Sequence, residues 1–361
     1  MALTAKHFNK LDSFQFLSDP KKFIYKNIPE VFPGNASEIS IQKENFASLL
    51  AKTSRSKVGV GEKTVLDLNS RSSHEITELD ISSKFIETIK PIVEDMAMKI
   101  DNPTKIQIHP YKLVLYQKGD FFESHIDNSH RDHMIMTLIV DFPTELEGGT
   151  LIIDDQAIPH TKDQLKLILF YNDIEHRVTK VTQGSKMSLI FDVCQESELI
   201  PEVIDKYYPS IRSTLGWNDI KNVAFITNHV YFSHELKGPD RICYEIFKRL
   251  GKTSIKEVLI KDQRVFYPEI FPILRLGGVD KLYTPSDNLE IEKLYFFETD
   301  EDEDYIDDSS VPVDPKYCLG DVYFISSDAG AKVKFEAFDV TLGNEGFFGK
   351  IYESLAVFLE K

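Results

Sequence analysis

The tripeptide His125-Ile126-Asp127 constrains the fold more than any other stretch, because its polar side chains must be considered together with the distant His176. If residues 122–127 run as a β-strand, side chains alternate between two faces. His125 and Asp127 then point to the same face of the sheet, while Ile126 points to the opposite face. Strand pairing can bring His176 alongside them, although it lies far away in the sequence. The spacing therefore predicts a closely wrapped β-fold in which these three side chains meet.

Two imidazoles and one carboxylate form a chemically meaningful set, because together they can occupy one face of an octahedral metal ion. Three positions then stay free for substrates, which is the layout of non-haem Fe(II) oxygenase sites. Lys186 follows His176 by ten residues. On a strand farther into the barrel, its ammonium group would meet the far carboxylate of a dicarboxylic co-substrate, and that pairing offsets the cost of burying the lysine.

Each of these features is weak on its own. The chain contains ten histidines, so a His-x-Asp tripeptide arises easily by chance, as it would in a β-sandwich with scattered surface histidines. The combination of this tripeptide with Gly148-Gly149, a distal histidine, a lysine and Ser188 favours the metal site. His130 and His133 near the motif are better explained by a solvated loop than by a second metal site.

Four short runs carry a resemblance to a known family: residues 116–127 (YQKGDFFESHID), 137–140 (TLIV), 147–149 (EGG) and 170–176 (FYNDIEH). They make the stretch 112–193 similar to the catalytic domain of the 2-oxoglutarate- and Fe(II)-dependent oxygenases, and most closely to the prolyl 4-hydroxylase-like branch. The resemblance implies an enzyme that uses O₂ and 2-oxoglutarate to hydroxylate an aliphatic C–H bond, releasing succinate and CO₂. Prolyl 4-hydroxylation of a peptide or protein is the reaction typical of that branch.

The same resemblance assigns residues to the cofactors. Iron would be bound by His125, Asp127 and His176. 2-Oxoglutarate would be held by Lys186, Tyr116 and Ser188. No catalytic side chain beyond the iron ligands is implied, and ascorbate is a candidate reductant. The sequence departs from the family at Leu151, where many relatives have a threonine that helps to bind the co-substrate carboxylate, and the neighbouring Thr150 should face the other way.

Charge and composition narrow the partners. The net charge of −16 argues against a nucleic-acid backbone as the main partner and against a nucleic-acid demethylase, because such binding depends on clustered Lys and Arg. Three scattered cysteines are too few for a disulfide framework. The sequence shows neither a signal peptide nor an apolar run of membrane-spanning length. We therefore expect a cytoplasmic or nuclear protein that acts on a peptide or protein, with no nucleic-acid or membrane partner.

The expected fold class is α+β, with a double-stranded β-helix of the jelly-roll or cupin type as its core and helices flanking it. Apolar runs between turn residues predict strands at 114–116, 134–141, 150–154, 165–171, 177–181 and 186–193. Apolar residues at three- and four-residue steps predict a supporting helix over 81–100, which Asp80 or Ser82 can cap. Asp154 and Asp155 are expected to form a turn.

We expect three segments along the chain. Residues 1–105 would support the core, residues 106–196 would form the Fe(II)/2-oxoglutarate core, and residues 197–361 would form a mixed α/β extension of unknown function. In the extension we expect a helix over 240–250, strands near 223–227, 321–326, 332–340 and 352–359, and a solvated acidic loop over 298–308. Residues 236–241 and 342–346 resemble an extension found in some fungal members of the family.

Two further interpretations stay open. The first is a catalytically silent jelly-roll scaffold whose extension carries the function. The second is a cupin that binds another metal. Lys186, ten residues after His176, argues against this interpretation because it favours a dicarboxylic co-substrate. The sequence does not reveal the prime substrate, so free amino acids, peptides and proteins all remain candidates.

Overall fold

The computed structural model describes residues 20–29, 46–60, 63–79, 81–129, 131–215, 222–227, 229, 236–261, 264–266 and several short strands nearer the carboxy terminus. The chain divides into two compact units, one of residues 21–200 and one of residues 1–20 together with 201–361. The first unit contains every residue that the sequence assigned to the site. Because strands before residue 105 share sheets with later ones, this unit is wider than the predicted core. The three-segment division itself stays a prediction.

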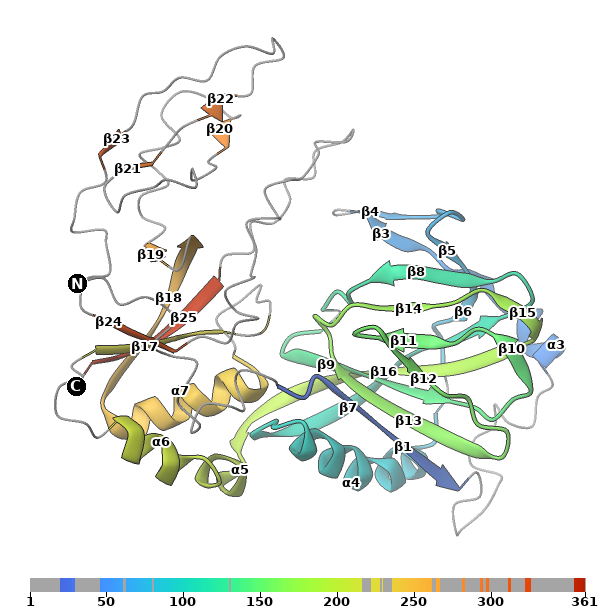
Figure 1. Ribbon diagram of the computed structural model, residues 1–361. Helices are drawn as coiled ribbons and strands as arrows, with labels where there is room; N and C mark the ends of the chain where they lie inside the picture. The colour runs from blue at the N-terminus through green and yellow to red at the C-terminus, as the bar shows by residue number, and fades with distance from the viewer. Residues whose placement is uncertain are drawn as a thin grey trace. The chain divides into compact units, whose positions relative to one another are not determined.

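The unit of residues 21–200 is built around two antiparallel sheets (Figure 1). The longer sheet has the strand order β1 (Phe23–Pro29), β13 (Gln164–Tyr171), β9 (Met134–Asp141), β16 (Lys186–Leu199), β7 (Thr104–Tyr116), β6 (His74–Ile76) and β2 (Ser54–Arg55). The shorter sheet has the order β12 (Gln156–Ile158), β11 (Leu151–Ile153), β14 (His176–Val178), β8 (Phe121–His125) and β5 (Arg71–Ser72). Two small pairs join β10 (Leu146–Gly148) to β15 (Val181–Gly184) and β3 (Val58–Val60) to β4 (Lys63–Val65).

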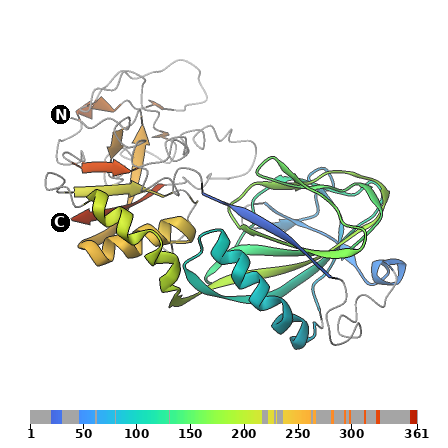
Figure 2. The same cartoon turned by 60° about the horizontal axis from the view of Figure 1, so that its bottom comes forward.

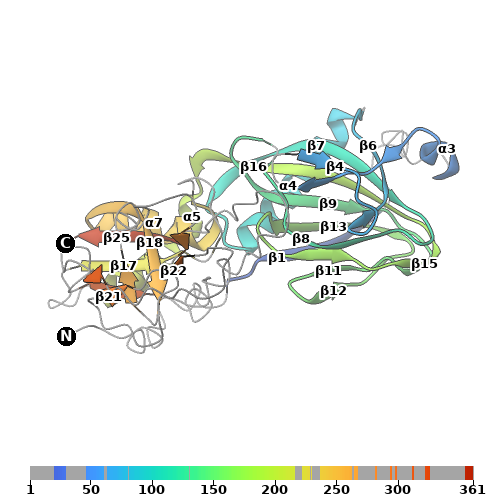
Figure 3. The same cartoon turned by 90° about the horizontal axis from the view of Figure 1, so that it is seen from above.

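The two sheets form two layers, with strands distant in sequence as neighbours (Figures 1 and 3). Every residue of β9 is buried, as are all residues of β13 after the first. Such continuous burial is expected where both faces of a sheet are covered. One face of the longer sheet meets the shorter sheet, and helix α4 packs against its other face (Figure 2). This arrangement confirms the predicted jelly-roll core.

Helix α4 (Ser83–Lys99) confirms the helix predicted over 81–100. Its buried side chains recur at three- and four-residue steps and include Phe85, Ile89, Val93 and Met96. The expected cap is corrected, because Ser82 occupies the N-cap position but its side chain makes no capping hydrogen bond. Asp80 lies outside the described residues. The burial of one apolar face, more than a side-chain cap, therefore holds this helix in place.

Two other sequence expectations can be compared with the strands. The strand expected over 177–181 is two strands, β14 and β15, separated by Thr179 and Lys180. Asp154 and Asp155 form the predicted turn between β11 and β12, both with positive φ (48° and 61°), as a tight hairpin turn requires. The segment 58–65 contains the antiparallel pair β3 and β4.

In the second unit, three helices lie near a mixed sheet. The helices are α5 (Pro201–Asp205), α6 (Tyr208–Leu215) and α7 (Gly238–Leu250), and α7 confirms the helix expected over 240–250. The sheet has the order β19 (Arg264–Phe266), β18 (Lys252–Lys261), β25 (Ser354–Glu360), β17 (Asn222–Ile226) and β24 (Val322–Ile325). Residues 299–308 of the acidic run, the strand expected at 332–340 and residues 342–346 lie outside the described residues. Among the described helices, none is long and apolar enough to cross a membrane.

Candidate metal centre

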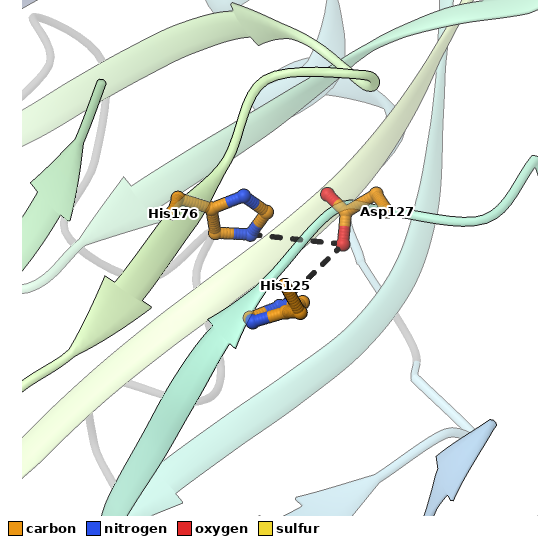
Figure 4. A group of neighbouring side chains, drawn as sticks. All are labelled: His125, Asp127 and His176. Atoms are coloured by element: carbon orange, nitrogen blue, oxygen red, sulfur yellow. Dashed lines mark ion pairs between the residues drawn. The ribbon is translucent and has the colours of Figure 1, made fainter. Parts of the chain in front are cut away.

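The structure brings His125, Asp127 and His176 together at one point (Figure 4). His125 is the last residue of β8 and His176 the first of β14, and the antiparallel pairing of these strands sets the two histidines opposite one another. The Nε2 atoms of His125 and His176 lie 3.9 Å and 3.7 Å from Oδ1 of Asp127. All three side chains line a cavity of about 540 Å³.

Asp127 reaches this point by a different route from the one expected. Strand β8 ends at His125, so alternation along a strand does not place the carboxylate. Instead, the backbone N–H of Asp127 donates to the carbonyl of Asn172 at 3.0 Å, and the Thr137 hydroxyl donates to Oδ2 of Asp127 at 2.5 Å. Oδ1 is thereby left on the side of the imidazoles. Sequence reasoning missed Thr137 and Asn172 in this role.

Both imidazoles are oriented by their own backbone. Nδ1 of His125 bonds the carbonyl of Glu123 at 2.8 Å, and Nδ1 of His176 bonds the carbonyl of Ile174 at 2.9 Å. A carbonyl oxygen only accepts, so each Nδ1 carries the hydrogen and each Nε2 is the ring atom available to a metal. Outer bonds of this kind commonly fix the tautomer of metal-ligating histidines.

This donor set fits a divalent metal ion. Two ligand atoms that are each about 2.1 Å from an ion lie at most about 4.2 Å apart. The imidazole-to-carboxylate separations are 3.9 Å and 3.7 Å, and the three ligand atoms all lie within 4.8 Å of one another, so small inward movements of the side chains bring them onto one shared ion. Two nitrogen donors with one carboxylate on one side are the ligands of the facial-triad Fe(II) sites. The residues present thus suit the iron that the sequence assigned to them.

Protonation also favours a metal. Burial, followed by the neighbouring His176, lowers the pKa of His125 to about 3, so its imidazole is neutral at ordinary pH. Burial acts to raise the pKa of Asp127, but His176, His125 and the Thr137 hydroxyl together lower it. A neutral imidazole beside an ionised carboxylate is the form that binds a cation.

Aromatic packing supports His125 from outside the metal position. The Phe122 ring stacks on the His125 imidazole with centroids 3.5 Å apart and planes at 21°. The guanidinium of Arg71 lies over the Phe122 ring, 4.3 Å from its centroid. Arg71 is only 4% exposed and lines the cavity. The stack restrains the ring that carries one candidate ligand.

The cavity wall is partly apolar and partly charged. Leu151, which stands where many relatives have threonine, is buried and lines the cavity, whereas the neighbouring Thr150 is not among the lining residues. Oε2 of Glu75 lies 3.4 Å from Nζ of Lys112 and 3.6 Å from Nη2 of Arg71. Burial and the nearby Arg71 lower the pKa of Lys112.

The three residues predicted to hold 2-oxoglutarate lie together, with one addition. Tyr116 pairs with Lys186 across β7 and β16, and it lines the cavity. Burial raises the pKa of Tyr116 to about 12, so its hydroxyl keeps its proton. Lys186 and Ser188 do not line the cavity, and both bond to Asp141, which the sequence did not indicate.

Other candidate ligands do not join the site. Within the described part of the chain, His125, Asp127 and His176 form the one group of three ligand-type side chains close enough to share an ion. His133 lies in a turn, as expected, and His130 lies outside the described residues.

Comparison with known proteins agrees with this location. Residues 111–191 match the family model of the 2OG-Fe(II) oxygenase superfamily. A PKHD-type hydroxylase from Psychrobacter sp. (strain PRwf-1) is 29% identical over 98 residues, which cover 23% of this chain and 37% of the relative. The match therefore spans little more than a third of that relative's length.

The solved structures that resemble part of this chain include two prolyl hydroxylases. A prolyl-4-hydroxylase from Pseudomonas putida has 12% sequence identity and a TM-score of 0.33, covering 51% of this chain and 98% of its own. A prolyl hydroxylase from Trichoplax adhaerens, solved with a hypoxia inducible factor peptide fragment, has 16% identity and a TM-score of 0.35, covering 52% of this chain and 89% of its own.

Proposed function

We infer from the 2OG-Fe(II) oxygenase domain in residues 111–191 that this chain is a 2-oxoglutarate- and O₂-dependent Fe(II) oxygenase that hydroxylates an aliphatic C–H bond. The observation that carries the proposal is the convergence of His125, Asp127 and His176 on one point in the wall of a cavity. In this proposal these three residues bind Fe(II). Tyr116, Lys186 and Ser188 form the polar group that meets the far end of 2-oxoglutarate.

The bound cofactors would supply the oxidation itself, in which O₂ converts 2-oxoglutarate to succinate and CO₂ while one oxygen atom enters the substrate C–H bond. The protein contributes geometry and a dry environment. His125 and His176 present Nε2, while Thr137 fixes the rotation of Asp127 so that Oδ1 faces them. Tyr116 keeps its hydroxyl proton and can donate a hydrogen bond to an anionic ligand.

The apolar part of the cavity excludes water from the reacting atoms. Leu151, Ile139, Val178 and Ile190 line it together with the metal-binding side chains. In such surroundings each electrostatic contact to a bound anion is stronger than it would be in water. The polar groups of the site therefore act on a ligand that is shielded from water on its apolar side.

The prime substrate that we propose is a peptide or protein, with prolyl hydroxylation as its reaction. The structural neighbours that are prolyl hydroxylases motivate this choice, one of them solved with a peptide fragment. Mass spectrometry of cellular proteins that gain one oxygen atom only when the active chain is present would identify the substrate. A free amino acid that gains oxygen, with no modified protein, would contradict the peptide assignment.

The reaction class has a direct test. Anaerobic addition of Fe(II) and 2-oxoglutarate should produce the weak visible charge-transfer band of the chelate, and admission of O₂ should produce succinate. Asp127→Ala should lose both signals, whereas Asp163→Ala, which changes an exposed carboxylate outside the cavity, should keep them. If Asp127→Ala or His125→Ala retains the band and succinate production, the assignment is wrong. Loss of both signals in the unaltered protein would favour the catalytically silent scaffold.

A further inference from the structure

Asp141, the last residue of β9, is a buried carboxylate that already bonds the two β16 side chains assigned to the far end of 2-oxoglutarate. Its Oδ2 accepts a hydrogen bond from Nζ of Lys186, and its Oδ1 accepts one from the Ser188 hydroxyl at 2.6 Å. Asp141 is 8% exposed, and Lys186 and Ser188 are each 3% exposed. The protein therefore supplies its own carboxylate at the position expected to receive one from the ligand.

Strand register makes this contact a built feature of the barrel. Asp141 is the direct partner of Ser188 on β16 and of Lys166 on β13. Directly opposite residues project from the same face of a sheet, so these side chains gather on one side. The Lys166 ammonium lies over the Tyr25 ring at 4.7 Å, and His160 bonds the Gly148 carbonyl at 3.2 Å. Lys186 therefore makes the hydrogen bond to Asp141, while Lys166 is a second buried cation that interacts with the same carboxylate at longer range.

Charge pairing changes what Lys186 can offer a ligand. The Asp141 carboxylate hydrogen-bonds Lys186 and also interacts with the second buried ammonium on this face, that of Lys166, so part of the attraction of these two cations is already satisfied within the protein. A second carboxylate arriving from the cavity must displace Asp141 from Lys186 or lie beside a like charge, which is unfavourable in a poorly solvated site. An uncharged tail meets neither penalty. The cavity reaches Tyr116, the partner of Lys186 across the sheet, but not Lys186 itself.

We propose that Asp141 sets the co-substrate selectivity of the site. By occupying Lys186 and Ser188, it weakens the preference for a 2-oxo acid with a second carboxylate over a 2-oxo acid with an uncharged tail. The chain then accepts both classes of 2-oxo acid at the metal. This inference rests on the proposed function, because it requires a 2-oxo acid bound beside His125, Asp127 and His176.

The test compares two ligands of equal length. In 2-oxopentanoate a methyl group replaces the far carboxylate of 2-oxoglutarate. The protein is loaded with Fe(II) without O₂, and the dissociation constant of each acid is measured from the charge-transfer band, so that no prime substrate is needed. For the unaltered protein we expect 2-oxoglutarate to bind less than about tenfold more tightly than 2-oxopentanoate.

The deciding variant is Asp141→Asn, which leaves Lys186 without its carboxylate partner. We expect the preference for 2-oxoglutarate over 2-oxopentanoate to rise at least tenfold, through tighter binding of 2-oxoglutarate. A smaller rise, no change or a fall would overturn the proposal, and a fall would show that Asp141 instead positions Lys186 for the ligand. Because both acids are measured on the same protein, a partly unfolded sample does not alter the ratio.

Two further variants control the result. Asp120→Asn removes a carboxylate that is similarly buried at 3% exposure but is paired with Arg55 at 3.3 Å, so the ligand preference should stay unchanged. If Asp141→Asn does not fold, the double variant Asp141→Asn/Lys186→Met removes both charges of the Lys186–Asp141 pair, so that Lys186 is not left buried without its hydrogen-bonded partner. The preference of this double variant for 2-oxoglutarate over 2-oxopentanoate should stay within tenfold of that of the unaltered protein. A larger fall in this preference would overturn the proposal, because it would show that Lys186 anchors the ligand despite Asp141.

Different results would refute the proposed oxygenase function and the proposed role of Asp141. If neither acid produces the band with the unaltered protein or with Asp141→Asn, the proposed function fails and this inference fails with it. If 2-oxoglutarate produces the band but Asp141→Asn does not raise the preference tenfold, only the role of Asp141 is refuted.

Discussion

Replacing Thr137 with valine should weaken metal binding about ten- to hundredfold, which is the usual effect of losing an outer hydrogen bond to a metal ligand. The Thr137 hydroxyl donates to Oδ2 of Asp127 at 2.5 Å, and Oδ1 faces the two imidazoles at 3.7 Å and 3.9 Å. Valine has nearly the same shape but no donor, so the carboxylate can rotate away from its metal-facing position. A ten- to hundredfold loss corresponds to about 1.4–2.7 kcal/mol of binding free energy.

The metal-free protein should also lose stability. A hydrogen bond to a charged group contributes about 1.5–3 kcal/mol, and Thr137 is 3% exposed, so the unfolding free energy of the Thr137→Val protein should fall by up to that amount. Calorimetric titration with Fe(II) or Co(II) without O₂ measures the affinity, and urea unfolding of the metal-free protein measures the stability.

Two variants separate the metal effect from a general structural one. Thr144→Val removes a hydroxyl that donates to the Ser185 carbonyl at 2.7 Å, so it should lose stability but bind metal as the unaltered protein does. Thr137→Ser keeps the donor and should retain most of the affinity. Unaltered metal binding by Thr137→Val would refute the reasoning that this hydroxyl orients Asp127.

Three other changes have outcomes that the structure determines. Ile89→Ala in α4 should cost about 2–5 kcal/mol in urea unfolding, because Ile89 is fully buried and leaves a cavity. The fold lowers the pKa of His125 to about 3, whereas the imidazole of the unfolded chain has a pKa of about 6.5, so the unfolded state binds more protons between these pH values. The unfolding free energy of the metal-free protein should therefore fall as the pH drops from about 6.5 towards 3. His125→Asn should lose less unfolding free energy over the same pH range. Gly148→Ala should destabilise more than Gly119→Ala in thermal unfolding, because both glycines have positive φ but only the Gly148 Cβ would meet the Lys180 carbonyl oxygen, at 2.1 Å.

The meeting of the three candidate ligands was predictable from sequence because strands impose strong local patterns. The run from Met134 to Asp141 is apolar enough to show a buried strand, and β9 has the predicted bounds. Strand pairing was expected to bring His125 and His176 together despite their distance in sequence, and they are direct partners in the sheet. What failed was the local geometry at Asp127, because a backbone bond to Asn172 replaces the expected strand there.

The residues that the sequence did not reveal act through pairing between distant strands. Asp141 stands before Phe142 and Pro143, where an acidic residue resembles an ordinary strand end. Its meeting with Lys186 depends on the register between β9 and β16, and that register involves long-range pairing that local propensity does not determine. One available signal was the two-residue period, which sets Asp141 on the same face as Thr137.

The resemblance assigns Lys186 to 2-oxoglutarate, but the sequence of β16 alone does not determine how strongly this lysine binds the ligand. The pairing of β16 with neighbouring strands explains why. Alternate residues put Lys186 and Asp192 on one face of β16, and each meets an opposite charge within the protein, Asp141 in the first case and Arg131 at 3.0 Å in the second. Between these pairs, Ile190 lies opposite Ile139 of β9. The charge on this face of the longer sheet is therefore the sum over several strands, because Lys112 of β7 lies opposite Ile190 and Lys166 of β13 lies opposite Asp141. Replacing Asp141 alters that sum by one unit while the metal-binding side chains stay unchanged, so the ligand preference of Asp141→Asn measures what the neighbouring strand contributes.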